Sequence, residues 1–545
     1  MRTRHGCAMV VAAALVLAAC GDDDGGAPVP APSALTVSGT AARGAALAGA
    51  AVGAKCASGT PSAVSGTTAA TGAYSISLEG AGLPCVLRVT GAGGEVYHSV
   101  VAGTGSSGSH TANLSPLTEL MVAHLSGGAP AAYFDGFGAG AAVSTDALAQ
   151  AASYVRSALA DVAALGAINP ATDALAVGDA HDQAIDATMA ALTSAGVTLD
   201  AVVAAAAANP AAPAVIGAAL APTSGSCSWL RSGKYRVIDF YEFGADTVQI
   251  DARAGTASGE NETAVLTPGA DCTFITDEPD WITQIMVSSG SVGVVQGRSK
   301  STTERNFEIA FPEQVLPVSE FAGTWNALSW HPPDAAPAGR VAAVYELSID
   351  AAGQLTALAE CQGMAACVSE SGPLSRLVAN ASGGFDEILP DGSTWSRVFL
   401  YKTLAGNRLA VWTSPEGQTV LMVPKAAHAA LPALGRLTKF RSVTASGLGT
   451  ISDPADGANT VTAVDAATRT VALTRSADNL VEQVRFDAPR DGLRYRALND
   501  CTIGGAMVGC AERVQLPLTG MGITLTGSVG SSAASAFFTA AVVKP

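Results

Sequence analysis

The 545-residue chain is acidic, sparsely charged and rich in apolar residues. Charged residues make up 14% of it and hydrophobic residues 48%, and the formal net charge at pH 7 is −16. This apolar content excludes a chain that is disordered through low hydrophobicity and high charge. The 30 Lys and Arg residues form no basic run, so the positive footprint of a nucleic-acid-binding protein is missing. The length predicts about three to four domains.

The N-terminus has the three parts of an export signal, which predict that residues 1–19 are removed. Two arginines precede an apolar stretch that ends in Leu17-Ala18-Ala19-Cys20. These four residues resemble the lipobox of bacterial lipoproteins, in which the cysteine is acylated and becomes the first mature residue. The resemblance implies a lipid anchor on Cys20. An ordinary signal peptide with an incidental cysteine is the alternative.

Residues 20–35 are acidic and proline-rich, which predicts a solvated tether after the anchor. In the lipoprotein class, an Asp directly after the lipidated cysteine favours retention in the inner membrane. That position is Gly21 in this chain. The resemblance therefore implies attachment to the outer membrane, and the sequence leaves open whether the protein faces the periplasm or the cell surface.

Eight of the ten cysteines remain after Cys7 and Cys20 are set aside. An even number in an exported protein predicts disulfides, although eight cysteines allow 105 pairings. Cysteines that are neighbours along the chain fall within the same proposed domain, so these are the predicted pairs. They are Cys56 with Cys85, Cys227 with Cys272, Cys361 with Cys367, and Cys501 with Cys510. A metal site is disfavoured because no C-x-x-C motif and no nearby His accompanies any pair.

Residues 36–112 read as short strands between glycine-rich turns. Tyr74 and Ile76 alternate with serines, as in a half-buried strand, and Gly72 suits a turn with positive φ. The segments Val37-Ser38-Gly39-Thr40, Leu47-Ala48-Gly49-Ala50-Ala51-Val52, Thr71-Gly72-Ala73-Tyr74-Ser75-Ile76 and Val86-Leu87-Arg88-Val89 together resemble the carboxypeptidase regulatory-like domain. The resemblance implies a small transthyretin-like β-sandwich, of a kind that usually serves a structural or binding role.

Residues 113–222 predict a helical domain. Ser115 and Pro116 have the types expected at an N-cap and a first helical position. A second helix is predicted from residue 145 to about 165, and Asp179 is expected to open a third. The Ala-rich stretch 199–220 is interrupted by two prolines, and we interpret it as a close-packed soluble helix pair rather than a membrane span.

The remainder of the chain predicts antiparallel β structure in three consecutive units, 223–316, 317–430 and 431–545. Each unit has a glycine-started strand and a later strand that ends in Ile-Asp-Ala or Val-Asp-Ala, at residues 250–252, 349–351 and 464–466. The units are expected to be meanders or barrels, or parts of one sheet system. The fold class predicted for the whole chain is therefore mainly β and multidomain, α+β overall.

One acidic loop is a candidate ligand site. Asp277, Glu278, Asp280 and Trp281 place carboxylates beside an aromatic ring, a combination able to bind Ca²⁺ or a stacked sugar. The spacing is not that of an EF-hand, and a solvated turn is the alternative interpretation. The six tryptophans, all between Trp229 and Trp412, are expected mainly in the core.

Other signatures of chemistry are weak. The group Asp179, His181, Asp182 and Asp186 is interpreted as a helix start rather than a metal site. The sequence contains no G-x-S-x-G elbow and no P-loop or dinucleotide fingerprint, so no catalytic residue, cofactor or metal is predicted.

These observations favour a lipid-anchored envelope protein with a non-enzymatic binding or structural role. Its expected partners are the outer membrane and a glycan, an envelope protein or a small apolar ligand. The alternative hypothesis is an exported hydrolase with an unrecognised catalytic region, which predicts a cleft where a His or a pair of carboxylates converges. Fold alone does not decide between the two hypotheses.

Overall fold

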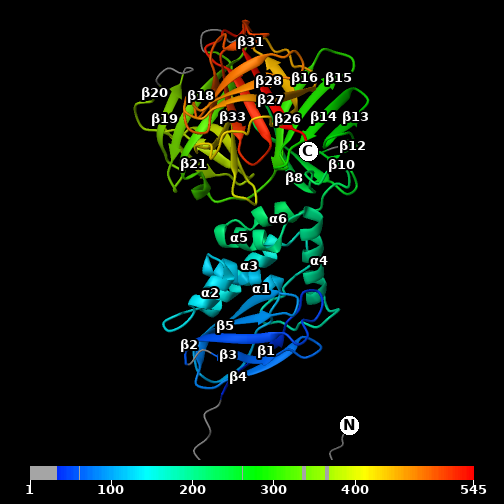
Figure 1. Cartoon of the computed structure of the whole chain (residues 1–545), viewed down its shortest axis with the longest axis vertical. Coiled ribbons are helices and arrows are strands. Elements are labelled where there is room, and N and C mark those ends of the chain that lie inside the picture. The colour runs from blue at the N-terminus through cyan, green and yellow to red at the C-terminus, as the bar shows by residue number, and fades with distance from the viewer. Residues whose placement is uncertain (1–33, 60–61, 261, 334–338, 362–366) are drawn as a thin grey trace, which may run out of the picture.

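The structure is a computed structural model that describes residues 34–545, apart from 60–61, 261, 334–338 and 362–366. The predicted signal peptide and Cys20 lie outside the described residues. The molecule is elongated, with an N-terminal sandwich at one end, helices in the middle and a large β assembly at the other end (Figure 1). The predicted mainly β fold class is confirmed.

The N-terminal part is a β-sandwich. One sheet has the strand order β4-β1-β7 and the other β3-β2-β5-β6. The inward side chains of both sheets, among them Val37, Val52, Ile76 and Leu87, share one buried cluster. The strands are β1 (Leu35–Thr40), β2 (Ala51–Ser58), β3 (Ser62–Thr67), β4 (Ala73–Leu78), β5 (Gly82–Thr90), β6 (Val96–Val101) and β7 (Gly108–Thr111).

Helices cover the four-stranded sheet of this sandwich and connect it to the β assembly. Val86 and Val100 of the sheet belong to the same apolar cluster as the helices, whereas Ala212 and Val215 pack into the core of the second β unit. The described helices are α1 (Pro116–Ser126), α2 (Pro130–Gly136), α3 (Thr145–Ala158), α4 (Ala180–Ala195), α5 (Leu199–Ala208) and α6 (Ala214–Leu220).

Local signals set the helix starts, as predicted. Ser115 and Thr118 form a capping box at the start of α1, and Asp179 caps α4 through the backbone N–H of Asp182. The predicted second helix is wrong at its end, because α3 stops at Ala158. The chain then forms tight turns, in which Leu159 and Leu165 are still buried. Taken one at a time, the described helices all lack the length and hydropathy to cross a membrane, and α4 and α5 meet that criterion only as a pair with a 100° bend.

The first β unit, which we call barrel 1, is a closed meander. Its first strand β8 pairs with its last strand β16, and the two ends of its strand order, β11 and β12, are separated by Leu266 alone. The strands are β8 (Gly233–Asp239), β9 (Asp246–Asp251), β10 (Thr256–Ser258), β11 (Thr263–Val265), β12 (Thr267–Pro268), β13 (Thr273–Asp277), β14 (Trp281–Val287), β15 (Gly293–Ser299) and β16 (Arg305–Pro312).

The second unit, barrel 2, repeats this strand order position by position. The order β20-β19-β18-β17-β25-β24-β23-β22-β21 corresponds to β11-β10-β9-β8-β16-β15-β14-β13-β12 of barrel 1. A short 3₁₀ helix, η1 (Val318–Phe321), precedes it. The strands are β17 (Gly323–His331), β18 (Val341–Ile349), β19 (Leu355–Cys361), β20 (Val368–Ser369), β21 (Arg376–Ala379), β22 (Phe385–Ile388), β23 (Thr394–Lys402), β24 (Arg408–Thr413) and β25 (Thr419–Pro424).

The third unit, barrel 3, is also closed between its first and last strands. Strand β26 pairs with β35, β28 pairs with β29, and the hairpin β31–β32 extends from the barrel. The strands are β26 (Leu437–Ser446), β27 (Ala455–Asp465), β28 (Thr470–Arg475), β29 (Val481–Phe486), β30 (Arg494–Arg496), β31 (Cys501–Ile503), β32 (Ala506–Met507), β33 (Arg513–Leu518), β34 (Ile523–Ser528) and β35 (Phe537–Val543).

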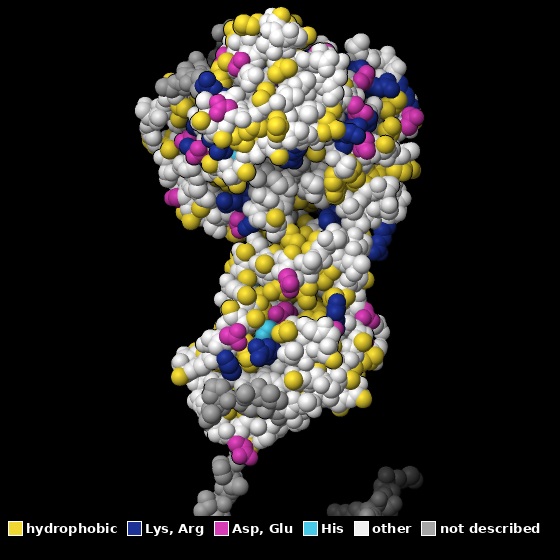
Figure 2. Space-filling model, in the orientation of Figure 1, with side chains coloured by type: hydrophobic (Ala, Val, Ile, Leu, Met, Phe, Trp, Pro, Cys, Tyr) yellow, Lys and Arg dark blue, Asp and Glu magenta, His cyan; other side chains and the backbone are white. Residues whose placement is uncertain are grey.

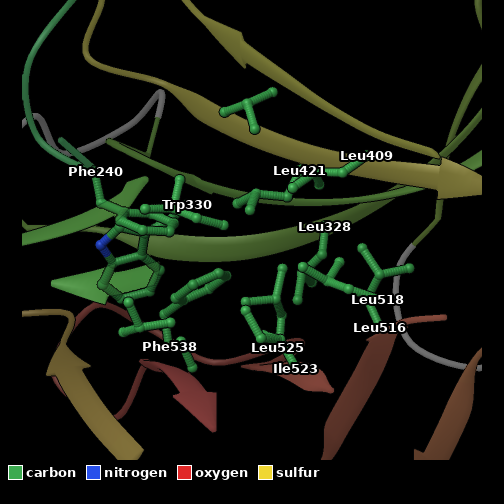
Figure 3. Close-up of a cluster of buried hydrophobic side chains, with 14 of the residues drawn as sticks. Phe240, Leu328, Trp330, Leu409, Leu421, Leu516, Leu518, Ile523, Leu525 and Phe538 are labelled. Carbon is green, nitrogen blue, oxygen red and sulfur yellow. The ribbon is translucent and has the colours of Figure 1, made fainter. Parts of the chain in front are cut away.

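The outer faces of the three barrels meet in one shared apolar core. Figure 3 shows Phe240 of barrel 1 facing Trp330 of barrel 2 and Phe538 of barrel 3, all fully or almost fully buried. The ring centroids of Trp330 and Phe538 are 5.8 Å apart, and those of Phe240 and Phe538 are 5.2 Å apart. The three barrels are therefore parts of one packed body.

The described residues form four disulfides, each between cysteines that are neighbours along the chain. Cys56–Cys85 joins β2 to β5, and Cys227–Cys272 ties the segment before β8 to the start of β13. Cys361–Cys367 and Cys501–Cys510 close short loops in barrels 2 and 3.

Candidate functional site

Each barrel encloses a cavity, and the three cavities differ in size and charge. Their volumes are about 220 Å³ in barrel 1, 130 Å³ in barrel 2 and 610 Å³ in barrel 3. Only the last lies in the range of about 300–1,000 Å³ that is typical of small-molecule sites. In barrel 2, the inward carboxylate of Glu387 is fully engaged, since it accepts hydrogen bonds from the Ser375 and Ser396 hydroxyls and the Trp412 indole N–H.

Three neighbouring strands of barrel 3 turn their polar side chains toward its cavity. Along β35, Thr539 and Ala541 line the cavity, whereas Phe538, Ala540 and Val542 pack into the shared core. Successive side chains of a strand point to opposite faces. The same alternation in β33 and β34 sends the apolar residues outward to the other barrels and leaves Gln515, Thr524 and Thr526 inside.

The charged lining of this cavity is entirely basic. It comprises Arg436, Arg494 and Arg513, with His428 beside them, and no carboxylate lines the cavity among the residues that the structure describes. Arg513 forms an ion pair with buried Glu482, a carboxylate that it shares with Arg496. In contrast, no Asp or Glu in the described part of the chain lies within ion-pair distance of the guanidinium groups of Arg436 and Arg494.

Arg494 is fixed by two neutral partners. Its guanidinium carbon lies 4.6 Å from the centre of the Phe486 ring, and its Nε donates to His428 Nε2 at 3.4 Å. Burial, followed by repulsion from Arg436, lowers the pKa of Arg494 to about 10. Arg494 therefore stays charged at neutral pH, at the cost of desolvation that an anion in the cavity would offset.

His428 supports Arg494 in its neutral form. Its Nδ1 lies 2.8 Å from Oδ1 of Asp487, and burial lowers the pKa of the imidazole. Neutral His428 donates from Nδ1 to Asp487 and leaves Nε2 to accept from Arg494. Burial opposes ionisation of Asp487, but hydrogen bonds from the backbone N–H groups of Gly492 and His428 and from the His428 ring lower its pKa to about 2. Asp487 also pairs with Arg469, and its charge attracts Arg494 and so opposes part of the fall in the pKa of Arg494.

The rest of the lining is divided between hydrogen-bonding and apolar groups. Hydroxyls and amides come from Thr438, Ser442, Asn459, Gln515, Thr524, Thr526 and Thr539, and apolar surface from Leu431, Phe440, Val461, Leu473, Phe486 and Val543. A cavity with this lining suits an amphipathic molecule whose anionic group meets Arg494 and Arg436.

A wider cleft lies at the waist of the molecule, between α5 and barrel 2. Hydrophobic side chains gather at the waist in Figure 2, and the cleft encloses about 920 Å³. Its charged residues satisfy one another, because Glu320 pairs with both Lys402 and Arg408. Every charged residue that lines this cleft in the described structure takes part in an ion pair, so the cavity of barrel 3 is the better candidate.

The predicted acidic loop lies at one end of barrel 1. Glu278 lines the cavity of that barrel, whereas Asp277 pairs with Lys300 at 2.5 Å. The backbone carbonyl of Asp280 accepts from the N–H of Lys300, and Trp281 begins β14. The structure thus brings only Glu278 of the four predicted residues to a cavity.

The other sequence candidates have structural partners. Asp179 caps α4, and His181 is buried with its Nδ1 3.2 Å from the Ala174 carbonyl oxygen. Within the described residues, no group of three or more His, Cys, Asp or Glu side chains is arranged to hold a metal. The Ser329 hydroxyl lies 2.9 Å from His331 Nδ1. Ser329 is fully buried, however, and it lines neither a barrel cavity, nor the waist cleft, nor the smaller pocket beside that cleft.

Sequence reasoning missed Arg436, Arg494 and His428, as well as Glu308, one of the carboxyl groups that line the cavity of barrel 1. The available signal was alternation: strand β33 reads Arg-Val-Gln-Leu-Pro-Leu and β35 reads Phe-Phe-Thr-Ala-Ala-Val-Val. This pattern marks one apolar and one polar face, but it does not say which face closes inward.

Comparisons with known proteins identify no family. No protein-family model and no curated protein sequence matches the chain. Among solved structures, transferrin binding protein B from serogroup B Neisseria meningitidis is 9% identical over 55% of this chain and 58% of that protein, with a TM-score of 0.19. A transferrin binding protein B mutant from Haemophilus parasuis is 6% identical over 55% of this chain and 65% of that one, with a TM-score of 0.18.

A protein of unknown function from the DUF3598 family of Nostoc punctiforme is 12% identical over 42% of this chain and 98% of that protein, with a TM-score of 0.17. The matches to the two transferrin binding proteins span less than two thirds of their lengths. At these scores the likeness carries no inference about the fold or activity of the chain.

Proposed function

We propose that this chain is a lipid-anchored envelope protein whose third barrel binds a small amphipathic anion. The observation that carries the proposal is the cavity of about 610 Å³ in barrel 3, whose charged lining is wholly basic in the described structure. Arg494 is half-buried and has no ion-pair partner among the described residues, and an anionic ligand offsets the cost of its partial desolvation. The apolar and hydroxyl lining provides contacts for the rest of the ligand.

The ligand class follows from Arg436 and Arg494, which have no ion-pair partner among the residues that the structure describes. A planar guanidinium recognises a carboxylate, sulfate or phosphate with two parallel hydrogen bonds. Phe486 and His428 hold the Arg494 guanidinium in place before any ligand binds. Such preorganisation reduces the entropy lost on binding. A neutral molecule with the same apolar body is expected to bind more weakly.

Calorimetric titration of the full mature chain tests the proposal. Octyl sulfate serves as the anionic probe, below its micelle concentration, and octyl glucoside as the neutral one. We expect octyl sulfate to bind at a single site and Arg494→Gln to weaken its binding by roughly tenfold or more, because the ionic hydrogen bonds are lost. Arg494→Lys should retain part of the affinity.

Arg441→Gln is the matched control. Arg441 lies on β26 of the same barrel but pairs with Asp456 and does not line the cavity. Its substitution should leave octyl sulfate binding unchanged. Equal binding of the anionic and neutral probes, or equal loss in Arg441→Gln and Arg494→Gln, would contradict the proposal.

The lipid anchor is the second part of the proposal, and it is supported by the lipobox-like Leu17-Ala18-Ala19-Cys20. The anchor would make the outer membrane the protein's permanent partner. Mass spectrometry of the membrane-extracted protein should show an acylated N-terminal peptide that begins at Cys20. Cys20→Ala should release the chain from the membrane fraction, and an unmodified Cys20 in the wild type would contradict the assignment.

We further propose that residues 36–112 are a carboxypeptidase regulatory-like domain. The support is a strand in which Tyr74 and Ile76 are buried and Ser75 and Ser77 exposed, after a turn with Gly72 at φ 80°. In this role the sandwich acts as a spacer that holds the barrels away from the anchor.

A further inference from the structure

One end of barrel 1 gathers the loops that follow β8, β10, β13 and β15, because consecutive antiparallel strands alternate in direction. This end carries the carboxyl groups of Asp239 and Asp246, which flank the first loop, and those of Glu262 and Glu278 in the next two. Glu308 lies within β16 near the same end of the barrel. It is paired with Asp239, the last residue of β8.

The cavity that opens at this end is apolar along its length. It encloses about 220 Å³ and is lined by side chains such as Val237, Ile250, Phe274 and Ile285. Its charged lining consists of Glu262, Glu278 and Glu308, and no Lys, Arg or His lines it among the residues that the structure describes. Barrel 1 is therefore the electrostatic opposite of barrel 3.

Glu308 is the innermost of these carboxyls. Its Oε1 accepts a hydrogen bond from the Asn306 side-chain amide at 2.5 Å. Burial raises its pKa to about 8, with a further contribution from the charges of Asp239, Asp246 and Glu242. The group is thus mostly protonated at pH 7, and it has no cationic partner in the described part of the chain.

We propose that barrel 1 is a second ligand site, which takes a small apolar amine with its ammonium group against Glu308. The apolar wall accommodates the body of the molecule, and the surrounding carboxyls favour a positive charge at this end. For size, an apolar protein cavity of about 150 Å³ binds benzene. The cavity of barrel 1 therefore has room for one aromatic ring with a short amine arm.

The charges facing Glu308 from every neighbouring element are consistent with this assignment. Asp239 on β8, Glu242 in the following loop and Asp246 on β9 all repel a second negative charge. On the other side, β15 places Val295 opposite Glu308. Two cations at this end have other partners, since Lys300 pairs with Asp277 and Arg305 with Asp453. Arg340, whose charge acts on Asp239, donates to the backbone carbonyls of Gly417 and Tyr241. An incoming ammonium is therefore the group that would let Glu308 ionise.

The binding reaction has a proton signature. In the free protein at pH 7, Glu308 holds its proton, because its pKa is about 8. An alkyl ammonium, like that of Lys, is charged at this pH. When it binds, the carboxyl loses its proton, so close to one proton per ligand is released to the buffer. Affinity should rise as the pH is raised from 6 to 8.

Isothermal titration calorimetry of the full mature chain with benzylamine, benzyl alcohol and benzoate tests the inference. Benzylamine is expected to bind at least about tenfold more tightly than benzyl alcohol, and benzoate not at all. Titrations in buffers of different ionisation enthalpy should show the proton release. These comparisons use the wild-type protein, so they stand whether or not a variant folds.

Glu308→Gln keeps the shape of the side chain and removes its acid. This substitution should weaken the binding of benzylamine at least about tenfold and abolish the release of a proton. The affinity for benzyl alcohol should stay the same. Asp277→Asn is the matched control, because Asp277 lies at the same end but pairs with Lys300 outside the cavity. Equal affinity for the amine and the alcohol, proton release that persists in Glu308→Gln, or no benzylamine binding by the wild type would overturn the inference. Binding of octyl sulfate at Arg494 is unaffected by any of these outcomes.

Discussion

Glu482 is a buried acid that pairs with two arginines in the wall of barrel 3. Its Oε1 lies 2.5 Å from Nη1 of Arg496, and its Oε2 pairs with Arg513. Both Glu482 and Arg496 are almost wholly buried. Removing one partner of a buried ion pair leaves an uncompensated charge, which costs about 3–5 kcal/mol. We expect Glu482→Ala to lower the free energy of unfolding of barrel 3 by this amount, measured by calorimetry.

The control for this prediction is the exposed pair formed by Arg475 and Asp478 at the β28–β29 turn. Solvent screens such pairs, so Asp478→Asn should change stability little. Equal destabilisation by the two substitutions would show that burial of Glu482 does not set the size of the effect.

The lowered pKa of Asp487 predicts that the stability of the fold decreases at acidic pH. Its pKa in the folded protein is about 2, below the ordinary value of 3.8. A lowered pKa stabilises the fold above the unfolded-state pKa, and that stabilisation is lost as the pH falls through the folded-state pKa. The shift corresponds to about 2 kcal/mol. Denaturant titrations should show Asp487→Asn less stable than wild type at pH 6, with the difference shrinking between about pH 4 and 2. Parallel pH profiles would contradict the assignment.

At the scale of elements, the disulfides differ in the length of chain they close. Cys227–Cys272 spans 45 residues and Cys361–Cys367 spans 6. The entropy removed from the unfolded chain grows with loop length, to roughly 4 and 2 kcal/mol in the two cases. Replacing Cys227 and Cys272 by Ala should therefore lower the thermal transition more than the same change at Cys361 and Cys367. The reverse order would indicate that native-state packing around the bonds dominates.

The elements also show what the sequence was able to predict. The start of α1 at Pro116 and the cap of α4 at Asp179 depend on a few adjacent residues, and both were predicted. The end of α3 was not, because Leu159 and Leu165 remain buried after the helix stops. An apolar pattern in the sequence indicates which residues are buried, but it does not say whether they lie in a helix or in turns. Here the buried residues after Ala158 lie in turns. The short helix α2 was missed for lack of a side-chain cap.

The candidate sites were beyond sequence reasoning for a related reason. Arg436 and Arg494 are brought to one cavity only by closure of barrel 3, and Glu308 and Asp239 only by the pairing of β16 with β8. Closure also decides which face of an alternating strand turns inward. The mainly β class could be predicted from local sequence patterns alone. The charge of each cavity could not, because it depends on which strands pair, and those strands are dozens of residues apart.

At the scale of the whole molecule, the shared core couples the three barrels. Each barrel contributes the outward face of several strands, so the core exists only when all three are folded. The inward faces of barrels 1 and 2 form separate clusters. Strand β17 contributes to two cores. Trp325 packs into the inner core of barrel 2, and Trp330 packs into the core that the three barrels share. Both tryptophans are fully buried.

This strand therefore offers a matched pair of substitutions. Trp330→Ala and Trp325→Ala remove the same side chain, at a cost of about 3–5 kcal/mol each. Trp330 contacts Phe538 of barrel 3, whereas Trp325 donates its indole N–H to the Phe321 carbonyl next to barrel 2. Hydrogen exchange followed by mass spectrometry should show faster exchange in β34 and β35 for Trp330→Ala. For Trp325→Ala it should show faster exchange in barrel 2 alone. If both variants loosened only barrel 2, the barrels would be independent units that touch without sharing stability, and a ligand in one cavity would not be expected to stabilise the others.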